Sequence, residues 1–320
     1  MNKERQGTDS MKTQQIDSEY LSVSGIVFDI KKAAIHDGPG LRTTVFVKGC
    51  PLTCIWCHNP ESIRPQPEIK YLSMKCTGCG ACVRACAQAC HSIKAGAHTI
   101  DRTRCIQCGS CTDACPAEAL ELIGRPMSAE EVLGIVIRDR AFFESSGGGM
   151  TISGGEPMAQ FEFTRTLLQG AKALGLHTCL DTCGFARTDN YTRIRKYTDI
   201  FLFDVKETDP ERHREFTGRD NVRILDNLRH LDRLGAGIIL RCPIVPGCND
   251  RKEHLTAIGR LADSLNNVSQ INVMAFHPFG AHKSEQIGSA YTLQHGKAVD
   301  KKTADSWRRI IRTHTRVPVT

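Results

Sequence analysis

Three cysteines, Cys50, Cys54 and Cys57, stand in the spacing C-x3-C-x2-C within the stretch KGCPLTCIWCHNPES. Closely spaced thiolates are ligands for zinc or for an iron-sulfur cluster. Three of them can bind three irons of a four-iron cubane and leave the fourth iron open to a small molecule that chelates through an amine and a carboxylate. A structural zinc with His58 as fourth ligand is the alternative, although adjacent Cys57 and His58 would chelate a tetrahedral ion poorly.

A second set of cysteines forms an internal repeat. The segments KCTGCGACVRACAQAC from Lys75 and RCIQCGSCTDACPAEA from Arg104 superpose at a shift of 29 residues, and each reads C-x2-C-x2-C-x3-C. This is the pattern of two-cluster bacterial ferredoxins, in which the fourth cysteine of each run ligates the cluster of the other run. It predicts two four-iron clusters, one on Cys76, Cys79, Cys82 and Cys115 and the other on Cys105, Cys108, Cys111 and Cys86.

Zinc also suits such tight spacing, but two quartets that repeat in one register favour iron-sulfur clusters. Cys90 aligns with Ala119 of the second run, so we expect it to be a small buried residue and not a ligand. Ala87 stands where the second run has Pro116. Because all the cysteines are present, this departure does not change the prediction.

Composition limits the class of protein. Twelve of the 16 cysteines lie in the three short clusters, and the first 20 residues are polar, without the apolar segment of a secretory signal. Such cysteines indicate metal or redox ligands in a cytoplasmic protein, and no apolar run reaches the roughly 18 residues of a membrane span. The net charge is +7, but the 42 Lys and Arg are dispersed and aromatic residues make up only 6%, which argues against a nucleic-acid partner.

Short β-rich runs alternate with amphipathic segments outside residues 65–121. We expect helices in AEEVLGIVIRDRAFFES (129–145) and FTRTLLQGAKALG (163–175). We expect strands in LRTTVFVKG (41–49), MTISGG (150–155), HTCLDT (177–182), IFLFDVK (200–206), GIILRCPIV (237–245) and INVMAFH (271–277). Six β/α units in sequence predict an α/β fold with a parallel sheet and right-handed crossovers, a barrel or part of one.

Chemistry in such barrels gathers at the carboxyl ends of the strands. The unusual residues stand there: Cys50 after the first strand, SGGEP (Ser153, Gly154, Gly155, Glu156, Pro157) after the second, DTCG from Asp181 after the third, DVK from Asp204 to Lys206 after the fourth, Arg241 on the fifth and His277 closing the sixth. We predict a disordered arm (1–20), a discontinuous barrel (21–64 and 122–320) and a ferredoxin-like insert (65–121).

The arrangement C-x3-C-x-aromatic-C of Cys50, Cys54, Trp56 and Cys57 resembles the signature of the radical S-adenosylmethionine (SAM) superfamily. The resemblance implies a partial (β/α)6 barrel, with the methionyl part of SAM on the open iron. It implies that SGGEP lies against the SAM amino group, with Glu156 either fixing the loop or facing the ammonium. Trp56 packs on adenine or shields the cluster. Lys206 and Arg241 pair with the SAM carboxylate and ribose side or form a rim ion pair, and His277 is a SAM contact or a core histidine.

The stretch from Phe28 to Ser62 resembles the N-terminal region of glycyl-radical-enzyme activating enzymes, in which D-G-P-G-[IL]-R precedes the first strand. SGGEP, DTCG, DVK, RCPIVPGCND and FHPFG also match, so the resemblance covers about Gly25 to Gly280, and the insert is similar to that of the larger members. The resemblance implies reductive cleavage of SAM to methionine and a 5′-deoxyadenosyl radical. This radical removes a Cα hydrogen from a glycine of a partner glycyl radical enzyme. A flavodoxin- or ferredoxin-type protein is the implied reductant.

The same resemblance implies a monovalent cation site beside the SAM carboxylate, made by Asp181, Thr182, Asp204 and the carbonyl of Leu202. It implies that Asp37 and Gly38 touch the glycine loop of the partner. A capped loop and a tight Pro-Gly turn are the structural alternatives for Asp181 and for Asp37 with Gly38. Cys183 stands where relatives often carry Asn, and a thiol is the poorer hydrogen-bond partner. The implied cofactors are three 4Fe-4S clusters, SAM and this cation.

Two other hypotheses remain. A radical SAM maturase that oxidises a peptide side chain also carries auxiliary clusters in some cases. Those clusters usually follow the barrel, whereas here only four scattered cysteines follow residue 115. A plain ferredoxin-type electron carrier leaves the open three-cysteine site and SGGEP unexplained, and SAM-dependent production of 5′-deoxyadenosine would exclude it.

Overall fold

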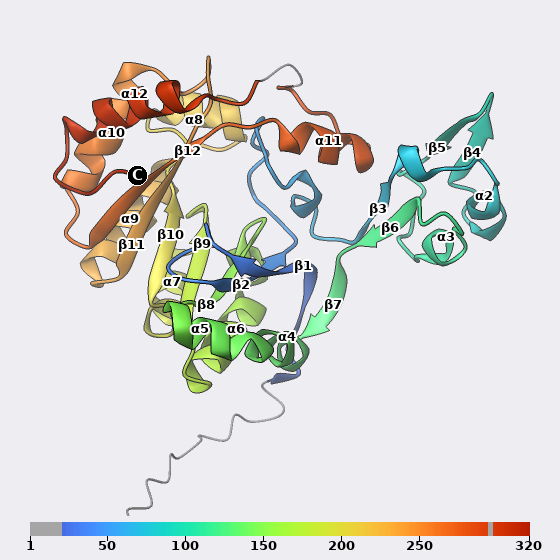
Figure 1. Cartoon of the computed structure of the whole chain (residues 1–320), viewed down its shortest axis with the longest axis horizontal. Coiled ribbons are helices and arrows are strands. Elements are labelled where there is room, and N and C mark those ends of the chain that lie inside the picture. The colour runs from blue at the N-terminus through green and yellow to red at the C-terminus, as the bar shows by residue number, and fades with distance from the viewer. Residues whose placement is uncertain (1–20, 294–296) are drawn as a thin grey trace, which may run out of the picture.

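The computed structural model describes residues 21–293 and 297–320, so the arm predicted to be disordered, 1–20, lies outside the described residues. The main element is an eight-stranded sheet in the order β12-β11-β10-β9-β8-β2-β1-β7 (Figure 1). Its strands are β1 (Ser24–Ala34), β2 (Arg42–Val47), β7 (Arg125–Ser128), β8 (Gly149–Gly154), β9 (His177–Thr182), β10 (Ile200–Asp204), β11 (Gly237–Ile244) and β12 (Val268–Ala275). Strands β2 and β8 to β12 pair in parallel, and each overlaps one of the six predicted runs, although β8 begins one residue and β12 three residues before the predicted start.

Helices connect the parallel strands. They are α6 (Phe161–Ala173), α7 (Thr188–Ile194), α8 (Pro210–Thr217), α9 (Val222–Arg233) and α10 (Lys252–Asp263), and α12 (Lys301–Arg312) follows β12. Strand β10, for example, reads IFLFD and is apolar on both faces, as expected for a parallel strand covered on both sides. Side chains such as Ile152, Leu167 and Leu180 are fully buried between the sheet and its helices.

Two strands of the main sheet were not predicted from the sequence. Strand β1 pairs antiparallel with β2, and β7 pairs antiparallel with β1, so both extend one edge of the parallel sheet. Their mixture of polar and apolar residues suits an antiparallel edge, where part of the surface meets water. These two strands hold the segment before the three-cysteine loop in the same sheet as the predicted strand ends.

The predicted helix at 129–145 is broken into α4 (Ala129–Val136), a 3-10 turn η3 (Ile137–Asp139) and α5 (Arg140–Ser146). The break lies where Asp139 turns toward the sheet and accepts hydrogen bonds from Thr43 Oγ1 at 2.7 Å and Lys32 Nζ at 3.0 Å. The other 3-10 turns are η1 (Pro60–Ser62), η2 (Ser73–Lys75), η4 (Pro157–Gln160) and η5 (Arg195–Tyr197).

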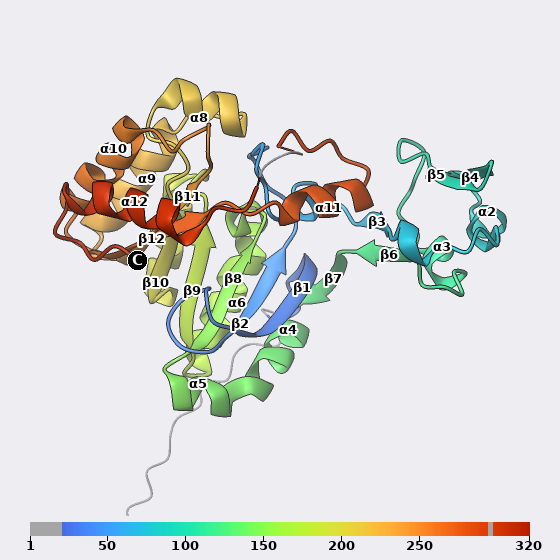
Figure 2. The same ribbon diagram turned by 45° about the horizontal axis from the view of Figure 1, so that its top comes forward.

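The chain leaves the sheet after β2 and returns to it at β7. The intervening segment contains two small antiparallel pairs, β3 (Glu68–Tyr71) with β6 (Leu120–Ile123) and β4 (His91–Lys94) with β5 (Ala97–Ile100), and the short helices α2 (Ala81–Ala85) and α3 (Ser110–Asp113). Both ribbon views show this unit to one side of the main sheet, with α11 (Phe279–Gln286) between the two parts (Figures 1 and 2). Among the described helices, none combines the length and apolar character needed to cross a bilayer.

Candidate active site

One pocket of about 200 Å³ opens at the carboxyl ends of the parallel strands. It brings together thirteen residues predicted as site residues: Asp37, Cys50, Cys54, Trp56, Cys57, Ser153, Gly154, Gly155, Asp181, Thr182, Asp204, Lys206 and Arg241. Glu156, Gly38 and His277 are not among the residues that line it. The sequence prediction that chemistry gathers at these strand ends therefore agrees with the geometry.

The three cysteines of the first loop all line this pocket. The loop is fixed by backbone hydrogen bonds, including Cys50 N to the carbonyl of Ile63 at 3.0 Å and Cys57 N to the carbonyl of Cys54 at 3.1 Å. Burial raises the pKa of Cys54 to about 12 and that of Cys57 to about 11. Thiols that resist ionisation in a dry loop become thiolates when a metal centre binds them, so this loop fits a cluster better than a free nucleophile.

A fourth cysteine adjoins this loop in the folded chain. The side chain of Cys183 hydrogen-bonds to Cys50, which lowers the pKa of Cys50 in spite of its burial. Burial, followed by the bond to Cys50, raises the pKa of Cys183 well above its ordinary value. Cys183 therefore stays a thiol, and the position that departs from the relatives' Asn contacts one of the three predicted cluster ligands.

The glycines of SGGEP let two loops approach closely. Gly154 has φ +123°, and a side chain at Gly154 or Gly155 would collide with the carbonyl of Val47 or Gly49. The backbone N–H groups of Gly155 and Glu156 donate to those same two carbonyls at 2.9 and 2.8 Å. The glycine loop is thus hydrogen-bonded directly to the segment that leads into the cysteines.

Glu156 is fully buried behind this loop. Its carboxylate accepts from Cys183 N at 2.7 Å, Thr182 Oγ1 at 2.8 Å and Met158 N at 3.0 Å. Burial raises the pKa of Glu156, and these donors oppose the rise. Of the two roles considered for Glu156, the contacts favour fixing the loop over facing a ligand ammonium.

Charged side chains of β9, β10 and β11 meet on the pocket wall. Asp181 Oδ2 accepts from Ser153 Oγ at 2.7 Å, and Lys206 Nζ donates to Asp204 Oδ2 at 2.5 Å. Arg241 Nη1 lies 3.6 Å from both Asp181 Oδ2 and Asp37 Oδ1. Burial raises the pKa of Asp181 to about 6 despite the opposing charge of Arg241. These five groups make a compact, partly compensated charge cluster.

Two atoms of this cluster lack a hydrogen-bond partner, although one of them takes part in ion pairs. Asp181 Oδ1 and Arg241 Nη1 are buried and make no hydrogen bond to any described residue. Such atoms are costly unless a ligand satisfies them. One is an acceptor and the other a donor, so together they suit a ligand that carries both an ammonium and a carboxylate, as the methionyl part of SAM does.

Asp37 and Gly38 are held at the rim of the pocket. Thr44 Oγ1 donates to Asp37 Oδ2 at 2.8 Å, and Thr151 Oγ1 donates to the Asp37 carbonyl at 2.7 Å. Gly38 has φ +121°, and an added Cβ would lie 2.9 Å from Cys179 Sγ. The turn therefore requires glycine, and it aims the carboxylate of Asp37 at Arg241.

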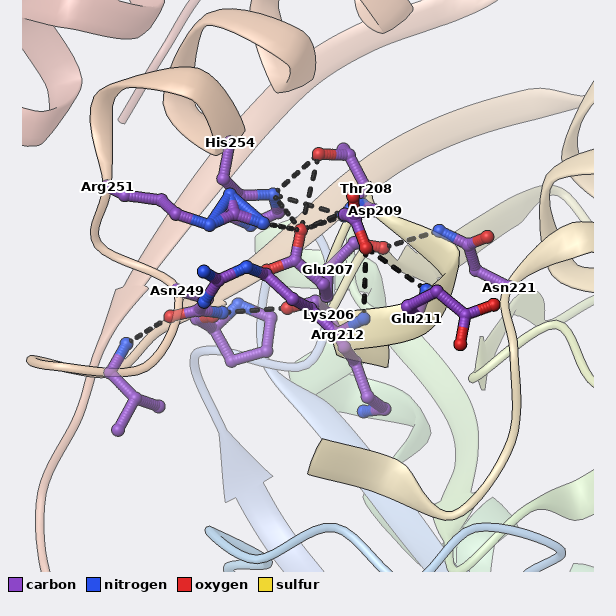
Figure 3. A network of polar contacts seen from close by, with 12 residues as sticks. Lys206, Glu207, Thr208, Asp209, Glu211, Arg212, Asn221, Asn249, Arg251 and His254 are labelled. Atoms are coloured by element: carbon purple, nitrogen blue, oxygen red, sulfur yellow. Dashed lines mark hydrogen bonds and ion pairs between the residues drawn. The ribbon is translucent and has the colours of Figure 1, made fainter. Parts of the chain in front are cut away.

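The loop that carries Lys206 is fixed by residues that the sequence analysis did not single out (Figure 3). Asn249 Nδ2 donates to the Lys206 carbonyl at 2.7 Å. Glu207 Oε1 accepts from Arg251 Nη2 at 2.7 Å and lies 3.2 Å from His254 Nδ1. The sequence feature that could have pointed to these residues is the RCPIVPGCND match, which contains Asn249 and ends one residue before Arg251.

Three predicted site residues have other partners as well. The ring of Trp56 lines the pocket and packs against Phe216 with centroids 5.5 Å apart. The hydroxyl of Thr182 is engaged by Glu156 and by Tyr191 OH at 2.9 Å. His277 stacks on the His58 ring with centroids 4.1 Å apart. His277 is thus in contact with a pocket-lining ring and not with the pocket itself.

The cysteines of the insert lie in two groups. Cys86, Cys105, Cys108 and Cys111 line one small pocket. After burial, the charges of Cys115 and Cys76 raise the pKa of the Cys82 thiol, so these three cysteines interact electrostatically. Each group brings together cysteines from both runs of the repeat, as the ferredoxin pattern requires.

The backbone repeats at the predicted shift. Gly80 and Gly109 have φ 73° and 82°. Cys90 N donates to Cys86 Sγ at 3.3 Å, and Ala119 N donates to Cys115 Sγ at 3.3 Å. Cys90 is buried, as expected, and its N–H donates to a neighbouring sulfur, and its side chain lines the same pocket as Cys86, Cys105, Cys108 and Cys111.

Comparisons with known proteins match two family models, which overlap at residues 102–120. Residues 102–258 match the radical SAM superfamily, and residues 75–120 match the 4Fe-4S dicluster domain. A solved radical SAM methyltransferase from Sphaerobacter thermophilus aligns with a TM-score of 0.53 over 92% of this chain and 76% of that chain. At 12% identity, that likeness shows the fold alone.

Several curated relatives match over most of their length. The trans-4-hydroxy-L-proline dehydratase activating enzyme of Clostridioides difficile is 39% identical over 269 residues, 83% of this chain and 89% of the relative. The isethionate sulfite-lyase activating enzyme of Nitratidesulfovibrio vulgaris is 40% identical over 304 residues, 88% of this chain and 97% of the relative. The choline trimethylamine-lyase activating enzyme of Oleidesulfovibrio alaskensis is 37% identical over 295 residues, 90% of this chain and 95% of the relative. The chain therefore belongs to the glycyl-radical-enzyme activating enzymes of the radical SAM superfamily.

Proposed function

We propose that this chain installs the radical on its partner enzyme through the pocket at the strand ends, with Cys50, Cys54 and Cys57 holding the catalytic cluster. The observation that carries this assignment is the open three-cysteine loop in one pocket with the unpaired atoms of Asp181 and Arg241. A four-iron cluster with SAM supplies, on one-electron reduction, methionine and a 5′-deoxyadenosyl radical that takes a glycine Cα hydrogen. The chain's own residues bind SAM and position the glycine.

The SAM contacts follow from the chemistry of the pocket wall. Arg241 and Lys206 attract the carboxylate and balance the charge near the thiolates. Gly154 and Gly155 admit the amino group close to their backbone. Trp56 presents its indole to the adenine while its other side packs on Phe216. Ser153 and Glu156 fix the SGGEP loop through hydrogen bonds to Asp181 and to the backbone of Cys183. His277 stacks on the ring of His58, which lines the pocket.

The cation site rests on fewer observations. Asp181 and Asp204 are carboxylates on adjacent strands, and Leu202 of β10 pairs with Asp181 across the sheet. A monovalent cation between them would relieve the repulsion of these carboxylates. The hydroxyl of Thr182 is occupied by Glu156, so we assign Thr182 to the support of the strand end.

The insert, residues 65–121, adds two 4Fe-4S clusters and brings the total to three. The support is the crossed grouping of the two cysteine quartets about a repeated backbone. A flavodoxin- or ferredoxin-type protein is the proposed reductant. The remainder, 21–64 and 122–320, forms the partial (β/α)6 barrel, and we assign the protein to the cytoplasm with no nucleic-acid or membrane partner.

The partner is a glycyl radical enzyme whose glycine loop meets the pocket rim at Asp37 and Gly38. Curated relatives of this chain are named as activating enzymes of a hydroxyproline dehydratase, an isethionate sulfite-lyase and a choline trimethylamine-lyase. The metabolic substrate never enters this chain, since only the glycine loop does, so the pocket does not discriminate among these partners.

Electron paramagnetic resonance tests this proposal. The anaerobically reconstituted, reduced protein is mixed with SAM and the glycyl radical enzyme encoded nearest its gene. We expect a stable glycine-centred doublet that is absent without SAM. SAM turnover to 5′-deoxyadenosine with no doublet, for every glycyl radical enzyme of the same genome, would instead favour a peptide-modifying maturase.

A cysteine substitution tests the cluster assignment. Cys54→Ala is expected to abolish SAM cleavage and remove about one third of the iron, because only one of three clusters loses a ligand. Cys79→Ala is expected to lose iron while SAM still binds, and Cys248→Ala, which alters a cysteine outside the clusters, serves as the control. Release of 5′-deoxyadenosine by reduced Cys54→Ala would show that the catalytic cluster lies elsewhere.

A further inference from the structure

Two histidines of the insert lie against one predicted cluster ligand. His91 and His98 project from the same face of the β4–β5 hairpin, where Ser92 pairs with Thr99. Their rings stack with centroids 5.1 Å apart and an interplanar angle of 7°, and His91 Nδ1 lies 2.9 Å from His98 Nε2. The pair is therefore a fixed unit and not two independent surface side chains.

This pair reaches a cysteine of the neighbouring helix. His98 Nε2 lies 3.6 Å from Cys82 Sγ, within hydrogen-bond range for sulfur, and Cys82 is buried on α2. The ring of Tyr71 contacts His98 edge-on, with centroids 4.6 Å apart and an angle of 78°. The Tyr71 hydroxyl also hydrogen-bonds to Cys76, a second ligand of the same predicted cluster. Two side chains outside the cysteine motif thus face one quartet.

The direction of the histidine bond follows from the ligand chemistry. A cluster-bound cysteine is a thiolate and can only accept a hydrogen bond. The hydrogen between the two atoms must therefore belong to His98 Nε2. Because that nitrogen then has no free lone pair, His91 Nδ1 can only accept from it, and the two acceptors hold the N–H of His98 in place.

The second cluster site has no equivalent of His98 or Tyr71, although His91 also lines its pocket and Ser110 Oγ lies 3.4 Å from Cys108 Sγ. At the shift of 29 residues, Cys82 corresponds to Cys111, His91 to Leu120 and Tyr71 to Ile100. His98 corresponds to Met127, which lies in β7 of the main sheet. The backbones of the two sites are alike, as the matching Cys90 and Ala119 N–H groups show, so the difference lies in the side chains.

We propose that His98, held by His91 and Tyr71, donates a hydrogen bond to the Cys82 sulfur and sets the reduction potential of the Cys76, Cys79, Cys82 and Cys115 cluster above that of the other insert cluster. The inference rests on the cluster assignment proposed above. Hydrogen bonds to ligand sulfurs stabilise the reduced cluster because it carries one more negative charge. One electron from a ferredoxin- or flavodoxin-type donor then occupies this cluster first.

Redox titration of the anaerobic holoprotein, followed by electron paramagnetic resonance, tests the proposal. His98→Phe keeps an aromatic ring against Tyr71 but removes the donor. We expect the midpoint potential of one insert cluster to become more negative while the other stays unchanged at unchanged iron content. Tyr71→Phe is expected to shift the same cluster in the same direction, and His282→Phe, an exposed histidine on α11, is the matched control. Equal midpoints for wild type and His98→Phe would overturn the proposal.

A second measurement does not depend on a variant that folds. In wild-type protein labelled with 15N-histidine, pulsed resonance on the one-electron-reduced state is expected to show a histidine nitrogen coupled to an insert cluster. The absence of such a coupling would overturn the proposal even if His98→Phe lost its iron. Cys82→Ala separates the two levels of inference. If this variant retains both insert clusters, Cys82 is not a ligand, and the assignment of the cluster fails independently of the role of His98.

Discussion

At the scale of single residues, Arg241 joins the two acidic positions of the pocket. It lies 3.6 Å from a carboxylate oxygen of Asp37 and of Asp181, two residues from distant parts of the chain. Burial by itself lowers the pKa of Arg241, but the surrounding carboxylates reverse this and raise it. The guanidinium thus stays charged, and its Nη1, which is ion-paired but makes no hydrogen bond to a described residue, can still donate to a ligand.

Replacement of Arg241 tests its role in SAM binding. Arg241→Gln is expected to weaken SAM binding by roughly 10- to 150-fold, because a hydrogen bond between charged groups contributes about 1.5–3 kcal/mol. The dissociation constant measured by equilibrium dialysis checks this, with iron content as a test of integrity. Arg229→Gln, at an exposed arginine of α9, is the matched control. Equal SAM affinities for the two variants would show that Arg241 pairs with Asp37 and Asp181 but does not bind SAM.

Arg42 of the DGPGLR segment is fully buried, although no carboxylate among the described residues lies within ion-pair distance. Its guanidinium donates to Thr151 Oγ1 at 2.6 Å, the Met150 carbonyl at 2.7 Å and the Pro39 carbonyl at 3.0 Å. It therefore fastens the turn that carries Asp37 to strand β8, and its role is structural positioning.

Loss of this side chain is expected to destabilise the fold. Arg42→Met leaves several buried acceptors without a donor, and each such acceptor costs about 1–3 kcal/mol, so we expect at least about 3 kcal/mol in the free energy of unfolding. Urea unfolding of the anaerobic holoprotein measures it. Arg187→Met, at an exposed arginine, is expected to stay within about 0.5 kcal/mol of wild type. Similar losses of unfolding free energy for Arg42→Met and Arg187→Met would contradict this positioning role of Arg42.

At the scale of an element, the loop between β10 and α8 depends on a buried carboxylate. Glu207 is fully buried and binds Arg251, the N–H of Asp209 at 2.9 Å and His254 (Figure 3). Burial tends to raise the pKa of Glu207, but the bond to His254, the Asp209 N–H and the charge of Arg251 outweigh it and leave the pKa below its ordinary value. The loop that presents Lys206 is anchored by this one charge.

The sign of the pH dependence follows from that lowered pKa. A carboxylate with a depressed pKa stabilises the fold above its unfolded value of about 4.3 and loses this contribution as pH falls through its folded pKa. Glu207→Gln is therefore expected to cost about 1.5–3 kcal/mol near pH 7 and progressively less below about pH 4. Urea unfolding at several pH values checks this, with the exposed Glu215→Gln as control. A cost that is independent of pH would show that only packing is lost.

At the scale of the whole molecule, charged side chains connect the insert and α11 to the rest of the barrel. Lys48, at the end of β2, is fully buried and lies 3.0 Å from Glu68 Oε2, the first residue of β3. Lys283 of α11 binds Glu61 at 2.7 Å, and Arg102 of the insert donates to the Gln286 carbonyl at 3.1 Å. The insert is thus fixed to the loop of the catalytic cysteines and is not a freely tethered module.

A double-mutant cycle measures this junction. Glu68→Gln leaves a buried ammonium without its carboxylate and is expected to cost about 3–5 kcal/mol in the free energy of unfolding. Adding Lys48→Met removes that ammonium and keeps the volume, so the double variant is expected to be more stable than Glu68→Gln alone. Urea unfolding of the single and double variants checks the order. A double variant less stable than Glu68→Gln would contradict a dominant ion pair.

The sequence alone determined the features that are local along the chain. The spacing of Cys50, Cys54 and Cys57 predicted an open cluster site because a metal-binding loop is a property of a few consecutive residues. The repeat from Lys75 and Arg104 predicted the two quartets for the same reason, and a 4Fe-4S dicluster domain matches this region. The six parallel strands followed from their apolar runs, whereas β1 and β7 were missed because antiparallel strands of mixed polarity lack that signal.

Only the tertiary structure decided which distant residues meet. Cys183 reaches Cys50, Arg241 reaches Asp37, and Lys48 pairs with Glu68 across the junction of barrel and insert. These contacts depend on strand order, on register and on how two packed units face each other. No local pattern of spacing or polarity encodes these quantities, because they arise from the burial of the whole chain at once.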